Sequence, residues 1–317
     1  MSIAIDPRRP LTAEVRRVLE REIGKALDHL AQARDRPEEA LHRCRKRLKN
    51  VRALLRLVRS ADPAFCKAEN ARYRDVAASL AGPREATALI ETVDRLVVAF
   101  PKQAEGGALQ PIRDAFAARR DRILHSGAEL EAAVGSAVDA CRDGLRRTAM
   151  LFLPDDAEQA ADILADGARK TLRRARKALQ RARSRGDAED FHELRKTVKA
   201  HAAHLLLLGR LWPASTRARR KAVDALGENL GELHDIFVMR ARIEGGNTPP
   251  GNAPEMPLLL RLLKRSERRL VKVCLASAAE LFEDRPGHAV KKLLRKARAG
   301  LAGASRRAST AVGTPPS

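Results

Sequence analysis

Aromatic residues are scarce in this chain of 317 residues: they make up 3% of it, with one tyrosine and one tryptophan. Proteins that bind single-stranded nucleic acid stack bases on aromatic side chains, so the composition argues against base recognition. The four cysteines show no C-x-x-C spacing, which argues against a disulfide framework or a zinc site. No apolar run approaches the roughly 20 residues of a membrane span, and the N-terminus shows no signal peptide. These absences predict a cytoplasmic protein without a membrane partner.

Negative charge is also in short supply, because 62 Lys and Arg face only 40 Asp and Glu. The formal net charge is +22, and the isoelectric point is near 10.8. Both halves contribute, with 29 basic against 21 acidic residues in 1–150 and 33 against 19 in 151–317. A hydrophobic content of 44% is ordinary for a globular protein. We therefore expect a folded basic protein that attracts polyanions in a salt-sensitive manner.

Strand signals are lacking, since no stretch alternates apolar and polar residues, whereas helix-forming residues abound. The predicted fold class is all-α. We expect Thr12 to cap the first helix and Pro37 to open the second. The expected helices are 11–34, 37–60, 64–80, one ending near 99, two more before 150, then 157–185, 188–210, 214–230, 233–243, 255–283 and 287–300.

One basic motif occurs twice with the spacing H-x-x-R-K-x-x-K, 150 residues apart. This spacing defines one face of an α-helix, which apolar residues normally fill. Like charges so close together repel each other on an isolated helix. An anionic ligand that neutralises the cations explains their concentration best. The first copy is His42, Arg45, Lys46 and Lys49, and the second is His192, Arg195, Lys196 and Lys199.

Apolar positions repeat together with the basic ones, on a second face of each helix. The third face is not repeated, because Arg43, Arg47 and Asn50 correspond to Glu193, Thr197 and Ala200. This contrast indicates an internal duplication. It predicts two pseudo-symmetric helical bundles, 1–153 and 154–300, followed by a disordered tail at 301–317. The apolar stripes are Leu41, Cys44, Leu48, Val51 and Leu55 in the first copy and Phe191, Leu194, Val198, His201 and Leu205 in the second.

Plainer explanations exist for each of these features. A basic stripe can be a solvated surface, although two stripes in register make that explanation weak. The two motif histidines can contact phosphate, pack between helices or accept a phosphoryl group. His201 and His204 have apolar counterparts and are expected to pack. Four cations at matching positions of the preceding helices either extend a groove or lie on ordinary surface: Arg21, Lys25, Lys170 and Arg174.

The segments LHRCRKRLKNVRALLRL and FHELRKTVKAHAAHLLLL, followed by LAGPREATAL and LGELHDIFVM, resemble the conserved histidine α-helical domain, or CHAD domain. The resemblance covers about residues 10–300. It implies two bundles related by a pseudo-twofold axis, a basic central surface and binding of inorganic polyphosphate, in some members on polyphosphate granules. Arg52 joins the first motif through the resemblance, although Ala202 replaces it in the second. The family's Arg-Asp pattern is altered here, to Arg84-Glu85 and to His234-Asp235.

The sequence thus predicts a non-enzymatic protein that binds polyphosphate in a central groove, without catalytic residues, cofactor or metal. No phosphate-binding glycine loop or metal-ligand cluster is present in the sequence. Granule proteins or polyphosphate-metabolising enzymes are the expected protein partners, and a location on granules follows. Two alternatives stay open. The same basic surface could bind nucleic acid, as in a nucleoid protein, or the chain could be an enzyme acting on phosphoanhydrides.

Overall fold

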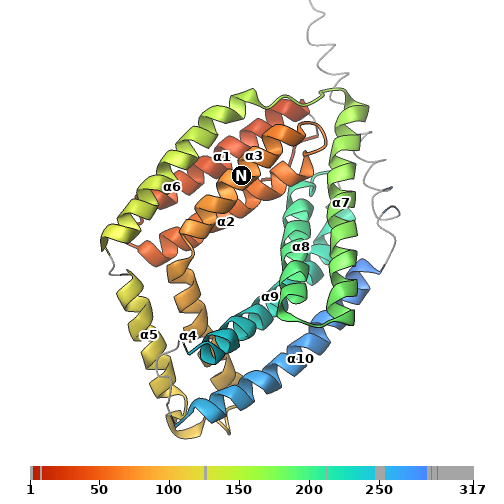
Figure 1. The fold of residues 1–317 in the computed structure, drawn as a ribbon. Coiled ribbons are helices and arrows are strands. Elements are labelled where there is room, and N and C mark those ends of the chain that lie inside the picture. Colours follow the sequence, from red (N-terminus) through yellow and green to blue (C-terminus); the bar gives the residue numbers. More distant parts are fainter. Residues whose placement is uncertain are drawn as a thin grey trace, which may run out of the picture.

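The predicted all-α class is confirmed by a computed structural model, which describes residues 3–7, 9–124, 127–211, 213–246, 254–283, 287 and 291. This part of the chain contains ten α-helices, two short 3-10 helices and no strand (Figure 1). The helices are α1 Leu11–Ala31, α2 Pro37–Leu57, α3 Pro63–Ser79, α4 Gly82–Ala99, η1 Glu105–Gly107, α5 Gln110–Leu124, α6 Gly127–Arg147, η2 Thr148–Met150, α7 Ala157–Ser184, α8 Ala188–Leu207, α9 Pro213–Glu244 and α10 Met256–Phe282.

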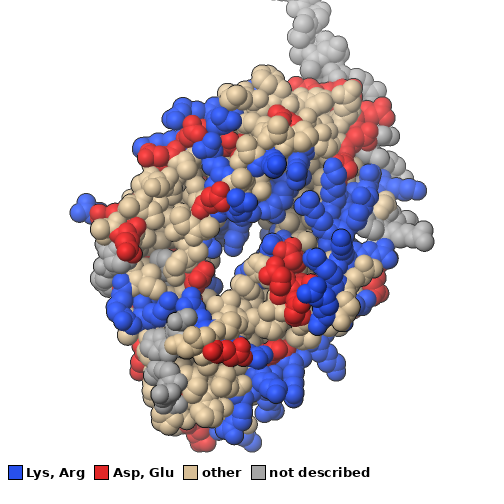
Figure 2. Space-filling view, in the orientation of Figure 1, with Lys and Arg blue, Asp and Glu red and all other residues tan. Residues whose placement is uncertain are grey.

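The helices form a frame around a central opening, which stays visible in the space-filling view (Figure 2). Helices α1, α2, α3 and α6 pack together on one side, and α7 with α8 forms the next (Figure 1). Helices α9 and α10 close the frame opposite α2, while α4 and α5 form the remaining side. The main helix packings between the two halves are those of α2 against α7 and α8 and of α4 against α9 and α10. Helix α2 and helix α8 therefore both border the opening.

The apolar stripes predicted from the sequence are buried. All ten stripe residues of α2 and α8 are less than 9% exposed. Apart from His201, these residues belong to one contiguous hydrophobic cluster that runs through both halves. Burying an apolar face fixes the rotation of a helix about its own axis. The rotation of α2 and α8 in turn determines where their basic stripes point.

Close backbone contacts join the halves where α2 meets α7 and α8. Gly167 of α7 lies against Leu57, so that a Cβ atom at Gly167 would come within 2.0 Å of the Leu57 carbonyl oxygen. His204 of α8 is buried and donates from Nε2 to the Ala53 carbonyl, 3.0 Å away. The internal duplication and the division after residue 153 stay predictions, because the helix arrangement alone does not test them.

Two expectations about helix ends are wrong. Thr12 does not cap α1, which begins after Pro10 without a side-chain cap. Instead, the Thr12 hydroxyl donates to the Leu153 carbonyl at 2.7 Å and accepts from the Leu153 amide at 3.1 Å. Thr12 therefore fastens α1 to the segment that joins the halves. The predicted segments 214–230 and 233–243 form a single helix, α9.

Burial explains why α9 continues through its glycines. Leu226, Leu230 and Leu233 are buried on one face, and this packing outweighs the low helix propensity of glycine, about 1 kcal/mol per residue. The first, second and eighth predicted helices end about three residues earlier than expected. The predicted helix at 287–300, apart from two of its residues, and the predicted tail at 301–317 lie outside the described residues. No described helix combines the length and apolar character needed to cross a bilayer.

Candidate anion-binding surface

The two basic motifs lie on adjacent helices at the central opening. Helix α2 begins at Pro37, with Glu38 and Glu39 in its first turn. Helix α8 is capped by the Asp187 carboxylate, which accepts from the Asp190 amide at 2.8 Å. With their apolar faces in the core, both helices turn cations toward the opening. Figure 2 shows Lys and Arg side chains gathered along its edges over α2 and α8.

Cations from both halves of the chain converge there. The ammonium group of Lys49 on α2 is repelled by the charges of Arg195 and Lys199 on α8. Arg45 and Arg84 of the first half repel it as well. Burial and then these cations lower the pKa of Lys49 to about 8. Lys49 is exposed to solvent by surface area. Partial loss of water and the neighbouring cations both disfavour its charged form.

We call this region the central basic surface. It combines the paired motifs with two residues from the helices that follow them. Its members are His42, Arg45, Lys46, Lys49, Arg84, His192, Arg195, Lys196, Lys199 and His234.

Several of these cations have no neutralising partner. Across the described residues, Lys49 and Lys199 take part in no ion pair or hydrogen bond, and the buried Nε of Arg195 has no acceptor. Arg45 donates to the carbonyl of Ala77. Burial lowers the pKa of Arg45 and of Arg195, in opposition to nearby carboxylates. Concentrated cations that lack counter-charges destabilise the free protein, and an anion bound among them would offset that cost.

The nearby carboxylates are engaged in ion pairs between α4 and α9. Arg95 of α4 pairs with Asp235 of α9 at 3.0 Å, and Arg242 of α9 pairs with Glu85 of α4 at 3.6 Å. Glu85 and Asp235 therefore both form ion pairs that join α4 and α9. Because each carboxylate already binds an arginine at the edge of the opening, much of the positive charge within it remains.

Two histidines face each other across α8 and α9. The rings of His192 and His234 lie 4.7 Å apart at 39°, and their Nδ1 atoms are 3.4 Å apart. Burial, then Arg195 and His192, lowers the pKa of His234 to about 4. The pKa of His192 is lowered by burial and then by Lys196. Loss of surrounding water, followed by Arg84 and other cations, also lowers the pKa of His42. At neutral pH all three favour the neutral form, able to take up a proton when an anion binds.

Two members of the central basic surface were not predicted as site residues. Arg84 contacts Glu91 at 3.0 Å and leaves its other terminal nitrogen buried without an acceptor. Its counterpart at the 150-residue offset is His234. The signal was present in the sequence, because the segments 80–85 and 230–235 align at the same offset as the basic motifs. The departure from the family's Arg-Asp pattern obscured their role.

Lys196 and the predicted residues outside the central basic surface contact other groups. Lys196 pairs with Glu193, and Lys170 pairs with Asp166 at 2.7 Å. Lys25 lies near His29 on α1, beside Arg43 and Arg47 rather than among the central cations. The structure places Arg21 on α1, half-buried. Arg52 of α2 and Arg174 of α7 both lie near Arg56. Arg56 follows Lys49 by two turns toward the C-terminal end of α2.

Histidines and cysteines outside the central basic surface have structural surroundings. His201 contacts the edge of Phe282 and accepts from Arg219 at 3.2 Å, so it packs in the core as predicted. All four cysteines are free and buried, with Cys44 in the core as predicted. The described residues contain no group of three or more His, Cys, Asp or Glu that could hold a metal ion. Chemically, the arrangement offers hydrogen-bond donors and positive charge to an extended anion.

Fold and site together define an all-helical protein with a cationic central surface. The family model of the CHAD domain matches residues 17–244, so the chain belongs to the CHAD domain family. The crystal structure of the CHAD domain from the plant Ricinus communis has the same fold, with a TM-score of 0.52 at 20% sequence identity. That similarity covers 95% of this chain and 92% of the plant one. No curated protein matches this chain in a sequence search.

Proposed function

We propose that this protein binds inorganic polyphosphate on the central basic surface, without catalysing a reaction, and that it associates with polyphosphate granules. The observation that carries the proposal is the convergence of Lys49 with Arg195 and Lys199, from opposite halves of the chain, while neither lysine forms an ion pair or hydrogen bond within the described residues. Membership of the CHAD family adds support, since that family is associated with polyphosphate-related proteins.

The chemistry of the surface favours a chain of phosphates over a nucleic acid. Arginine can grip phosphate oxygens with two parallel hydrogen bonds, and lysine supplies compact charge. Apart from histidine rings, no aromatic side chain belongs to the central basic surface as the described residues define it, so bases have no stacking platform. Inorganic polyphosphate has no bases and carries charge on every unit. Every unit of polyphosphate can therefore pair with a cation of the central basic surface, and no base is left without a contact.

The experiment removes charge from both helices at once, by changing Arg45, Lys46, Arg195 and Lys196 to glutamine. Affinity for long-chain polyphosphate should fall at least about a hundredfold, because several charge-assisted hydrogen bonds are removed. A control with the same reduction of charge changes Arg142, Arg146, Lys264 and Lys272, which are exposed on α6 and α10. Far-UV circular dichroism should be the same for all three proteins. Unchanged affinity in the first variant contradicts the site.

Competition decides between the two polyanions. Labelled polyphosphate bound at physiological salt should resist duplex DNA or RNA added at equal phosphate concentration. The logarithm of affinity should fall with the logarithm of salt concentration, with a slope of about −0.7 to −0.9 per phosphate neutralised, by analogy with nucleic acids. Displacement by DNA at equal phosphate contradicts the specificity. Release of phosphate from the polymer in the presence of magnesium or manganese contradicts the proposal that the protein is non-catalytic. A fluorescently tagged protein that stays dispersed in cells containing granules contradicts the proposed granule association.

A further inference from the structure

The basic stripe of α2 continues beyond the central basic surface. After Arg45 and Lys49, the positions Arg52 and Arg56 follow at intervals of three and four residues, which places all four on one face of the helix. At 1.5 Å per residue, the stripe spans about 16 Å from Arg45 to Arg56. Helix α8 has no such extension, because Ala202 and Leu206 occupy the matching positions. The two halves therefore differ in where cations lead away from the opening.

Arg52 and Arg56 compete for one neutral acceptor. Both donate from Nε to the side-chain oxygen of Asn70 on α3, at 3.4 and 3.3 Å. In the described structure neither forms an ion pair with a carboxylate. Each guanidinium offers five donors, so most of this capacity is unused. Two arginines that share a single amide oxygen leave room for an anion with several oxygens.

A third arginine approaches from α7. Burial, then Arg52 and Arg174, lowers the pKa of Arg56 to about 10, far below that of an ordinary guanidinium. Arg52 also lies near Arg74, but that residue is already bound to Asp75 at 2.8 Å. In the described residues no carboxylate forms an ion pair with any of these three arginines, although Asp75 lies near Arg52.

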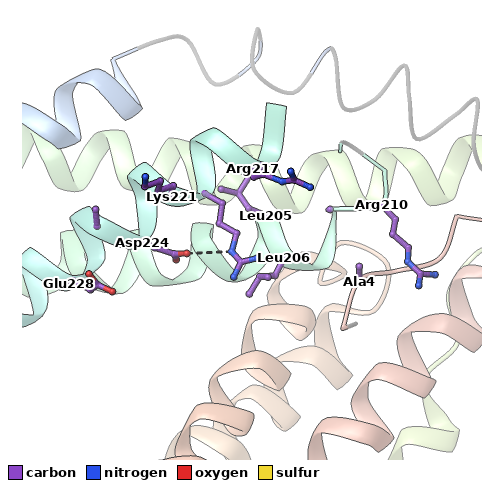
Figure 3. A pocket seen from close by; sticks show the side chains of 11 residues that line it. Ala4, Leu205, Leu206, Arg210, Arg217, Lys221, Asp224 and Glu228 are labelled. Atoms are coloured by element: carbon purple, nitrogen blue, oxygen red, sulfur yellow. Dashed lines mark ion pairs between the residues drawn. The ribbon is translucent and has the colours of Figure 1, made fainter. Parts of the chain in front are cut away.

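The alternative path, over α8 and α9, carries carboxylates among its cations. A pocket of about 650 Å³ lies there, with Arg217 and Lys221 on its wall (Figure 3). Lys199 is attracted by the charges of Glu228 and Asp224, which also line this pocket. These carboxylates would repel phosphate groups that leave the opening past Lys199. Two of the pocket's four cations are already paired, Arg220 with Asp224 at 3.3 Å and Arg210 with Asp6 at 2.9 Å.

We propose that Arg52, Arg56 and Arg174 form a second phosphate-binding subsite for the same polyphosphate chain, which leaves the opening along α2 toward α7 and not along α8. This inference rests on the proposed function and adds a direction and a length requirement to it. Tripolyphosphate can occupy the central basic surface but is too short to reach Arg56 as well. Long chains reach both places and gain affinity from the second.

The test compares ligands of two lengths on one variant, Arg56→Gln with Arg174→Gln. Glutamine keeps a hydrogen-bond partner for Asn70 and removes the charge. Affinity for long-chain polyphosphate should fall about tenfold, and the salt dependence should be shallower by about 0.7 for each phosphate group that the variant no longer binds. Affinity for tripolyphosphate should change less than twofold. The matched control is Arg34→Gln with Arg173→Gln, two exposed arginines that are not among the groups acting on Arg56.

Each outcome is informative about a different part of the account. Tripolyphosphate binding at wild-type strength shows that the variant is folded and that the central basic surface works. If long chains then also bind at wild-type strength, the second subsite does not exist. If both ligands weaken equally, Arg56 and Arg174 belong to the central basic surface and the length requirement is wrong. If wild-type protein binds neither ligand, the proposed function itself fails.

Discussion

Lys49 of α2 and Arg195 of α8 lie close enough that the arginine, after burial, contributes most to lowering the pKa of the lysine to about 8. The pair joins halves of the chain that are far apart in sequence. Such proximity of two cations is unfavourable in the free protein. It becomes favourable when an anion lies between them, and this relationship leads directly to a pH dependence.

Polyphosphate affinity should fall as the pH rises from about 8 to 9.5. Below its pKa of about 8, Lys49 is charged in the free protein and in the complex. Above that pH the free protein must take up a proton to bind, because the bound anion raises the pKa of Lys49. The fall approaches tenfold per pH unit at most. Lys49→Arg should flatten this part of the profile, while Lys46→Arg, on the same stripe, should not. Equal profiles for wild type and Lys49→Arg refute the role of Lys49.

Arg84 should contribute to binding although it already has an acidic neighbour. Its second terminal nitrogen is buried without an acceptor and lies among the central cations. Arg84→Gln should weaken polyphosphate binding about tenfold, the size of one charge-assisted hydrogen bond. Glu91→Gln removes the partner of Arg84 and should leave binding intact or strengthen it. Titration calorimetry of both variants distinguishes a ligand contact from a structural ion pair, for which the two substitutions would weaken binding alike.

The contact between α7 and α2 requires a glycine. In Gly167→Ala the new Cβ would meet the Leu57 carbonyl oxygen at 2.0 Å, so α7 must move away from α2. We expect a decrease of about 2 to 4 kcal/mol in the free energy of unfolding, as for other severe overpacking. Gly24→Ala in α1 is the control, since nothing lies within 4 Å of its Cβ. It should stabilise the protein by about 0.5 to 1 kcal/mol. Urea titration measures both, and equal effects would show that the contact is loose.

Acid should destabilise the protein through His204. Its pKa is about 4 in the folded state because of burial, whereas the unfolded chain takes up a proton near pH 6.5. The depressed pKa means that stability is intact above pH 6.5 and is lost as the pH falls toward 4, by on the order of 3 kcal/mol for this residue. His204→Gln should reduce the loss in urea titrations between pH 7 and 4. His42→Gln, at the opening, should have a smaller effect, and the reverse order would contradict the assignment.

The sequence was sufficient to predict the helices wherever packing follows the apolar period. Leu48 and Val198, for example, occupy matching stripe positions, and both are fully buried. Prediction failed at α9, where a break was expected after residue 230 and Gly231 follows. That glycine instead lies beside Arg195, with its Cβ position 3.9 Å from the guanidinium Nε. Propensity alone cannot tell a glycine that ends a helix from one that makes room for a neighbour.

The central basic surface was only partly predictable, because helical spacing identifies cations that share one helix. Arg84 and His234 come from α4 and α9 and join the others through tertiary packing alone. The third helix face, whose residues differ between the two motifs, also has a structural explanation. On α2, Arg47 and Asn50 bind the buried Glu22 of α1, with Asn50 at 2.7 Å. The matching position on α7 is Thr171, which needs no such partners.

A structure of the protein with bound tripolyphosphate tests the central claim most directly. The account predicts phosphate oxygens within hydrogen-bond distance of Lys49 on α2 and of Arg195 or Lys199 on α8, held by both helices at once. An anion bound on one helix alone, or on another face of the molecule while the opening stays free of it, would contradict the account.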